Sequence, residues 1–142
     1  MSRPPRAASS RLADRGLFLL GLAQGVSVLL GCLAVLFVAR QQGLAEGATR
    51  ALAFTALLGG NLALIAVNLS WSVGGERKSR PTNRVAFLVA GLAMSGLIAS
   101  LVLAPVRSVF HFDPVPPRLA LGAFGAGALS VAWFTVWKRV RR

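Results

Sequence analysis

The stretch ALAFTALLGGNLALIAVNLSWS, residues 51–72, decides the fold of this chain. It contains no charged residue, and as an α-helix rising 1.5 Å per residue it is long enough to cross the roughly 30 Å hydrocarbon core of a bilayer. Lipid offers no hydrogen-bond partner to a backbone amide, so the stretch is expected to be helical. It also carries Asn61 and Asn68, and polar side chains inside a membrane need an explanation because burying them is costly.

Three further runs share this length and this lack of charge. The four runs cover residues 17–39, 51–72, 85–105 and 119–137. The sequence therefore predicts an all-α fold, an integral membrane four-helix bundle over residues 17–137. A basic segment, residues 1–16, precedes the bundle and a basic tail, residues 138–142, follows it. The first run is longer than the apolar region of a signal peptide, typically about 7–15 residues, and is expected to be a true span.

Composition agrees with a membrane protein and argues against nucleic-acid binding. Of the 142 residues 55% are hydrophobic and 14% charged, and the mean hydropathy is +0.65. The 16 Lys and Arg against 4 Asp and Glu give a net charge of +12. These basic residues lie in clusters between the apolar runs, without the interleaved aromatic residues that stack on bases, so no nucleic-acid partner is expected.

The distribution of charge predicts the topology. Twelve of the sixteen basic residues fall in the N-terminal segment, the connection between the second and third runs, and the C-terminal tail. They are Arg3, Arg6, Arg11, Arg15, Arg77, Lys78, Arg80, Arg84, Lys138, Arg139, Arg141 and Arg142. Because basic residues concentrate on the cytoplasmic side, both termini are predicted to be cytoplasmic, in a multi-pass protein of the cell (plasma) membrane. Anionic lipid headgroups of the bilayer are the natural counter-charge.

The two asparagines are seven residues apart and therefore lie within about 20° of each other on an α-helix. Two interpretations remain open. The amides of Asn61 and Asn68 either fasten this helix to its neighbours, which we favour, or line an ion path through their carbonyl oxygens.

Small residues at helical spacing recur in the first, third and fourth runs and predict close helix packing. Together with the asparagines and one glutamine, the predicted helix-packing residues are Gly21, Gln24, Gly25, Asn61, Asn68, Gly91, Ser95, Gly122 and Ala126.

Catalytic chemistry is not expected. No span contains a carboxylate, and no phosphate-binding glycine loop or Ser–His–Asp set is found. In the connection 106–118, His111 and Asp113 offer two metal ligands, which do not make a site, and three prolines predict the absence of regular helix. We therefore predict no catalytic residue, no cofactor and no metal site.

Four segments, in this order, resemble a known family. They are MSRPPR (residues 1–6), ATRALAFTALLGGNLALIAVNLSWS (48–72), APVRSVFHFDPVP (104–116) and WFTVWKRVRR (133–142). The chain is similar to the C-terminal transmembrane domain of P-type cation-transporting ATPases, of the calcium-pump-like, bacterial type.

The resemblance implies the last four-helix block of such a pump, which supports the ion-translocating helices. It makes Asn61 a weak candidate for an ion ligand, although the carboxylate that the family places nearby is missing. The phosphorylation segment DKTG, the actuator loop TGES and the hinge GDGxND are also missing, so the chain alone is not expected to be an enzyme.

The resemblance also implies partners. Residues 1–6 look like the middle of a loop, so the remaining helices and domains of a pump are expected from the preceding DNA or from a separate chain. Two alternatives stay open: an independent small oligomeric carrier or channel, and a membrane subunit that regulates another protein.

Overall fold

The computed structural model describes the backbone of residues 10–71 and 84–140, and the side chains of residues 18–67 and 84–133. Within these ranges all regular secondary structure is helical, which confirms the all-α prediction. In chain order the helices are α1 (Ser10–Gln41), α2 (Glu46–Trp71), α3 (Arg84–Val102), α4 (Ala104–Val109) and α5 (Pro117–Val140).

Three of the helices are long and apolar enough to cross a membrane, judged over the residues with described side chains. These segments are Phe18–Gln41 of α1, Glu46–Val67 of α2 and Arg84–Val102 of α3. In α5 the described side chains are those of residues 117–133. A protein with such helices belongs in a membrane.

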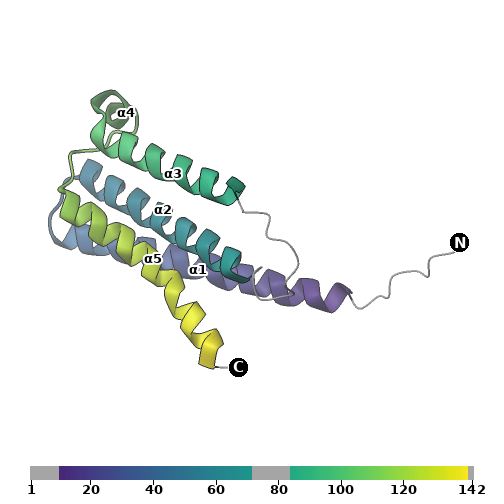
Figure 1. Cartoon of the computed structure of the whole chain (residues 1–142). Coiled ribbons are helices and arrows are strands. Elements are labelled where there is room, and N and C mark those ends of the chain that lie inside the picture. The colour runs from purple at the N-terminus through teal and green to yellow at the C-terminus, as the bar shows by residue number, and fades with distance from the viewer. Residues whose placement is uncertain (1–9, 72–83, 141–142) are drawn as a thin grey trace, which may run out of the picture.

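Helix α2 is the centre of the arrangement. It packs against α1 and α5, which also touch each other, while α3 lies along α2 and the short α4 sits at the end of α3 (Figure 1). The beginning of α1, the end of α2, the beginning of α3 and the end of α5 all point toward one end of the molecule (Figure 1). The connection from α1 to α2 and the segment from α3 to α5 lie at the other end.

The helices do not coincide with the apolar runs. Helix α1 begins at Ser10 rather than 17, and α2 begins at Glu46 rather than 51. An apolar run records the part of a helix that lipid can cover, whereas the helix itself continues into polar and charged residues.

Proline explains the difference near residue 103. The third apolar run reaches 105, yet α3 ends at Val102 and α4 begins at Ala104 after an extended Leu103. Pro105 lacks a backbone N–H and would clash inside a continuous helix, but it fits the first turn of a new one. The expectation of no regular helix from 106 to 118 is therefore wrong for residues 106–109, which belong to α4, and for residues 117–118, with which α5 begins.

Helix α1 ends in a turn at a glycine, and this turn leads the chain to α2. Gly43 has a φ of +67°, in the left-handed region that glycine adopts without a steric penalty. Its N–H donates to the carbonyl oxygen of Arg40, and the N–H of Leu44 donates to that of Ala39, the two bonds of a Schellman motif. Leu44 then packs on the core that contains Ala39, so the turn returns the chain along α1.

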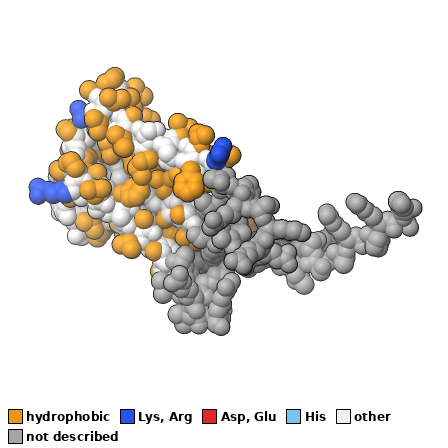
Figure 2. All heavy atoms as spheres, viewed as in Figure 1, with side chains coloured by type: hydrophobic (Ala, Val, Ile, Leu, Met, Phe, Trp, Pro, Cys, Tyr) orange, Lys and Arg blue, Asp and Glu red, His pale blue; other side chains and the backbone are white. Residues whose placement is uncertain are grey.

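The core consists mainly of small side chains. The buried hydrophobic residues of the described part are Val28, Ala39, Ala48, Ala51, Leu52, Ala56, Leu97, Ala123 and Val131. Large apolar side chains instead cover the outside, as on α3, where Phe87 and Leu88 are both 69% exposed. In the view of Figure 2 the described surface is hydrophobic and uncharged over most of its area, with Arg side chains at its edges. Such a surface suits lipid or other apolar helices.

Candidate functional site

One face of α2 is built from small residues and forms the interface with α1 and α5. Its buried positions are Ala48, Thr49, Ala51, Leu52, Thr55, Ala56, Gly59 and Gly60. The spacing of three and four residues places them along one side of the helix. In lipid the hydrophobic effect does not drive helices together, because the acyl chains are as apolar as the side chains. A face of small residues therefore associates with a neighbouring helix through close van der Waals contact.

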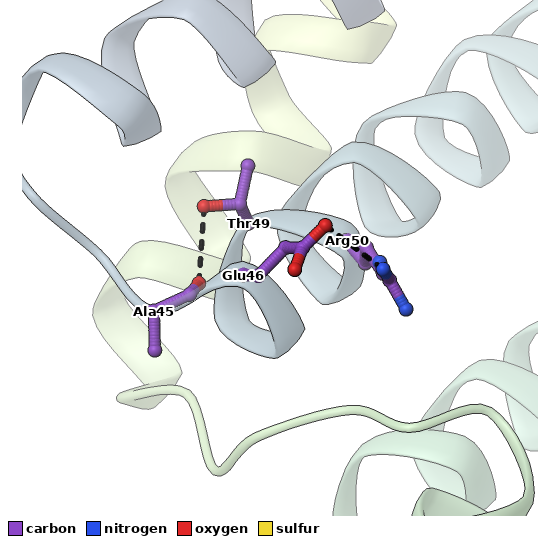
Figure 3. Close-up of polar contacts among 4 residues, drawn as sticks. All are labelled: Ala45, Glu46, Thr49 and Arg50. Carbon is purple, nitrogen blue, oxygen red and sulfur yellow. Dashed lines mark hydrogen bonds and ion pairs between the residues drawn. The ribbon is translucent and has the colours of Figure 1, made fainter.

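The two buried threonines of this face keep their hydroxyl groups within α2. The Thr49 hydroxyl donates to the carbonyl oxygen of Ala45 (3.1 Å; Figure 3), and the Thr55 hydroxyl donates to that of Ala51 (2.7 Å). Their polar atoms are therefore satisfied locally, and the side chains fill space between helices as small, branched groups.

Backbone meets backbone where α2 crosses α5. A Cβ atom at Gly127 would overlap the carbonyl group of Ala56, and one at Gly59 would overlap the carbonyl oxygen of Phe124. Neither obstacle can rotate away, because both belong to the main chain of a helix. Glycine is thus required for the observed separation of α2 and α5.

Two further glycines, Gly31 of α1 and Gly60 of α2, bring α1 into close contact with α5 and α2. A Cβ at Gly60 would lie 2.8 Å from Cγ1 of Val28 on α1, and one at Gly31 would lie 2.8 Å from Cβ of Ser130 on α5. The Ser130 hydroxyl donates to the carbonyl oxygen of Gly127 at 2.6 Å and so stays on its own helix. The contacts join α1, α2 and α5 into one packed unit, which we call the glycine interface: Gly31, Gly59, Gly60 and Gly127 with their neighbours Val28, Ala56, Phe124 and Ser130.

The four glycines predicted from spacing do not lie at this interface. A Cβ at Gly21, Gly25, Gly91 or Gly122 would meet nothing within 4 Å. The spacing of small residues marks several faces of a helix alike, and only the shape of the neighbours selects the one that packs. The pairs Ala56–Gly60 and Ala123–Gly127 have the same four-residue spacing, so the signal was present in the sequence without being distinguishable from the others.

The other predicted packing residues differ in burial: Gln24 is buried, whereas Ser95 and Ala126 are exposed. Gln24 is only 5% exposed, and its Nε2 has no hydrogen-bond partner among the described residues. Ser95 is exposed and donates to the carbonyl oxygen of Leu92 on its own helix. Ala126 is exposed, although its carbonyl oxygen would lie 3.8 Å from a Cβ at Gly31.

Of the two predicted asparagines, Asn61 is the one whose side chain is described. Asn61 is exposed on α2, away from α1 and α5, and no hydrogen bond of its side chain to another described residue is found. Asn68 lies in α2, but its side chain falls outside the described residues. The packing role of both amides stays a prediction.

At the opposite end of α2, three phenylalanine rings join this helix to the segment that follows α4. Phe54 lies with its ring centroid 6.0 Å from that of Phe110 and 5.7 Å from that of Phe112. The two loop rings lie 5.4 Å apart. Distances of this size are those of favourable aromatic pairs, so the cluster fastens the loop to α2.

His111, between these two loop rings, has a structural role that the sequence did not suggest. Its φ is 52°, the left-handed conformation, and its N–H donates to the carbonyl oxygen of Ser108. The N–H of Phe112 donates to that of Arg107, which completes a second Schellman motif, here without glycine. The left-handed turn at His111 lets both Phe110 and Phe112 face Phe54.

Asp113 reaches the first turn of α2. A Cβ at Gly47 would lie 2.6 Å from its Oδ2, so the carboxylate sits directly over this glycine. A negative charge at a helix N-terminus is favourable, and Ala45, before the helix, has no side-chain acceptor to cap it. In the same turn Glu46 accepts a hydrogen bond from Arg50 at 2.9 Å (Figure 3). Asp113 thus helps hold the loop against α2.

Among the described residues no group of three His, Cys, Asp or Glu side chains lies close enough together to hold a metal ion. His111 and Asp113, the two candidates from the sequence, instead shape and anchor the loop.

Comparison with known proteins identifies a family. The family model described as cation transporting ATPase, C-terminus, matches residues 1–140. No curated protein and no solved structure gives a significant match.

Proposed function

The chain belongs to the family of C-terminal regions of cation-transporting ATPases, and from this premise we propose that it is the structural membrane module of a P-type cation pump. It gives mechanical support to the ion-translocating helices and performs no catalysis alone. The glycine interface carries this proposal, because direct backbone contact fixes the separation of helices more tightly than flexible side chains do.

The proposed partners are the remaining helices and domains of the pump, in the same or a separate chain, together with the bilayer. Two observations support this. Asn61 exposes an amide on a membrane-capable helix, where a polar group is costly unless another helix receives it. Helix α3 is mostly exposed, and only its Leu97 and Ser100 are buried. These surfaces suit further helices, with lipid over the rest.

The proposed topology is a four-helix bundle in the cell (plasma) membrane with both termini cytoplasmic. It is supported by the common direction of four helix ends: the start of α1, the end of α2, the start of α3 and the end of α5 (Figure 1). The sequence next to these four ends carries twelve of the sixteen basic residues. The other end of the bundle has only Arg40, Arg50, Arg107 and Arg118. Such an imbalance follows the positive-inside rule.

Complementation of a pump core tests the support role. A calcium-pump-type ATPase lacking its last four helices is expressed in membranes alone, with this chain, or with this chain carrying Gly127→Leu. We expect vanadate-sensitive, cation-dependent ATP hydrolysis only when the unaltered chain is present, and none from the chain alone. The matched control is Gly125→Leu, at a glycine with open space around it, which should restore activity.

Two results would oppose this proposal. In the first, the core reaches full activity without the chain. In the second, the Gly127→Leu chain restores activity as well as the Gly125→Leu chain, so that the glycine interface has no part in support. Cation flux through liposomes that contain the chain alone would instead favour an independent carrier or channel.

A further inference from the structure

An open groove of about 310 Å³ runs along the outside of α1 and α5. One end is polar and is formed by Gln42, just after α1, and by Arg118, at the start of α5. The rest is apolar, with walls such as Val35 and Val38, and a floor of small residues that includes Gly122 and Ala126. Ligand clefts in proteins begin at about this size.

The groove is oriented along the helices. From Arg118 to Ala126 on α5, and from Gln42 back to Ala34 on α1, it spans about 12 Å at 1.5 Å per residue. Its polar end lies where the α1–α2 turn and the start of α5 come together (Figure 1). In a bilayer this end is at headgroup level and the apolar part descends beside the acyl chains.

Arg118 is an available cation at the mouth of this groove. Its side chain is exposed, and among the described residues the one ion pair found joins Arg50 to Glu46. Asp113, the nearest acidic residue along the chain, is placed against Gly47 of α2 instead. A guanidinium group with an amide beside it is suited to bind a phosphate.

We propose that this groove binds one anionic phospholipid, with its phosphate at Arg118 and one acyl chain along the small-residue floor. Shape favours a lipid over another helix. A helix about 10 Å across and 12 Å long occupies roughly 900 Å³, three times the groove, whereas an acyl chain is far thinner. The inference rests on membrane insertion and not on the support role, so either can fail without the other.

The test uses the full chain in nanodiscs of phosphatidylcholine, probed with spin-labelled phosphatidylglycerol and spin-labelled phosphatidylcholine. The measured quantity is the association of each probe with the protein, relative to the bulk lipid. Arg118→Gln removes the cation, and Gly122→Leu places a side chain in the groove, where a Cβ meets nothing within 4 Å. The controls are Arg107→Gln on α4 and Gly91→Leu on α3, whose Cβ position is equally open.

We expect the preference for phosphatidylglycerol to fall about fivefold in Arg118→Gln, the effect of one basic residue near an anionic lipid. Gly122→Leu should reduce the motionally restricted fraction of both probes, while Arg107→Gln and Gly91→Leu behave as the unaltered chain. The proposal is overturned if Arg107→Gln lowers the preference as much as Arg118→Gln, since the attraction is then diffuse. It is also overturned if Gly122→Leu changes nothing, or if it dissociates a dimer, which would make a second copy the occupant.

Discussion

Replacing Gly127 with alanine should destabilise the bundle, although alanine favours helix formation. The added Cβ would overlap the carbonyl oxygen of Ala56 and lie 2.7 Å and 2.9 Å from its carbonyl carbon and Cα. Ordinary contacts between carbon atoms are about 3.5–4.0 Å, so α2 and α5 must separate by roughly 1 Å. A gap of that size removes about a quarter to a half of the attraction of each contact across it.

The matched control is Gly125→Ala, two positions away on α5, where a Cβ meets nothing within 4 Å. Both substitutions gain about 1 kcal/mol in helix propensity. The overpacking at Gly127 costs about 1–3 kcal/mol, so the free energies of unfolding of the two variants should differ by that amount. The assay is unfolding of the purified chain in mixed micelles with sodium dodecyl sulfate, followed by circular dichroism. Equal stability of the two alanine variants would refute the argument that backbone contact fixes α2 against α5.

Three further predictions concern the loop and the topology. Gly47→Ala should destabilise the chain by about 1–3 kcal/mol because its Cβ meets both the carboxylate and the backbone nitrogen of Asp113, and Asp113→Ala in the same chain should recover only part of the loss, since the backbone contact remains; a double variant as stable as Asp113→Ala alone would contradict the backbone contact. His111→Gly should stabilise the chain by up to about 1 kcal/mol, since it removes the cost of a left-handed φ of 52°; a lower unfolding midpoint than that of the unaltered chain would count against it. Alkaline phosphatase fused after Arg142 should be inactive, whereas the same enzyme inserted after Gly43 should be active; the opposite pattern would reverse the proposed topology.

The helices of this protein are predictable from its sequence because lipid permits few alternatives. An uncharged run of about 20 residues has to satisfy its own backbone, and helix does so for each of the runs that became α1, α2, α3 and α5. Boundaries are less predictable. The break at Leu103 depends on where Pro105 falls relative to a first turn, and α1 continues into residues that lipid does not cover.

The packing surface was harder to predict than the helices. Small residues at four-residue spacing occur on each of the long helices α1, α2, α3 and α5, so this spacing does not separate Gly60 and Gly127 from the predicted Gly122. What distinguishes them is the opposing helix: Val28 lies over Gly60 and Ala56 over Gly127, while nothing lies over Gly122. Such complementarity is a property of two helices together and cannot be read from one.

Helical geometry places Asn61, next to the glycine pair in sequence, on a different side of α2 from these glycines. Successive residues of an α-helix are rotated by about 100°, so Asn61 points roughly 150° away from the middle of the face formed by Ala56, Gly59 and Gly60. The glycine contacts and the Asn61 amide therefore lie on opposite sides of α2. The inner side needs no polar bond, because main chains in direct contact already exclude lipid between them. On the outer side an amide is favourable only against another polar group, so Asn61 is the residue of α2 at which the proposed contact with a further helix should be tested.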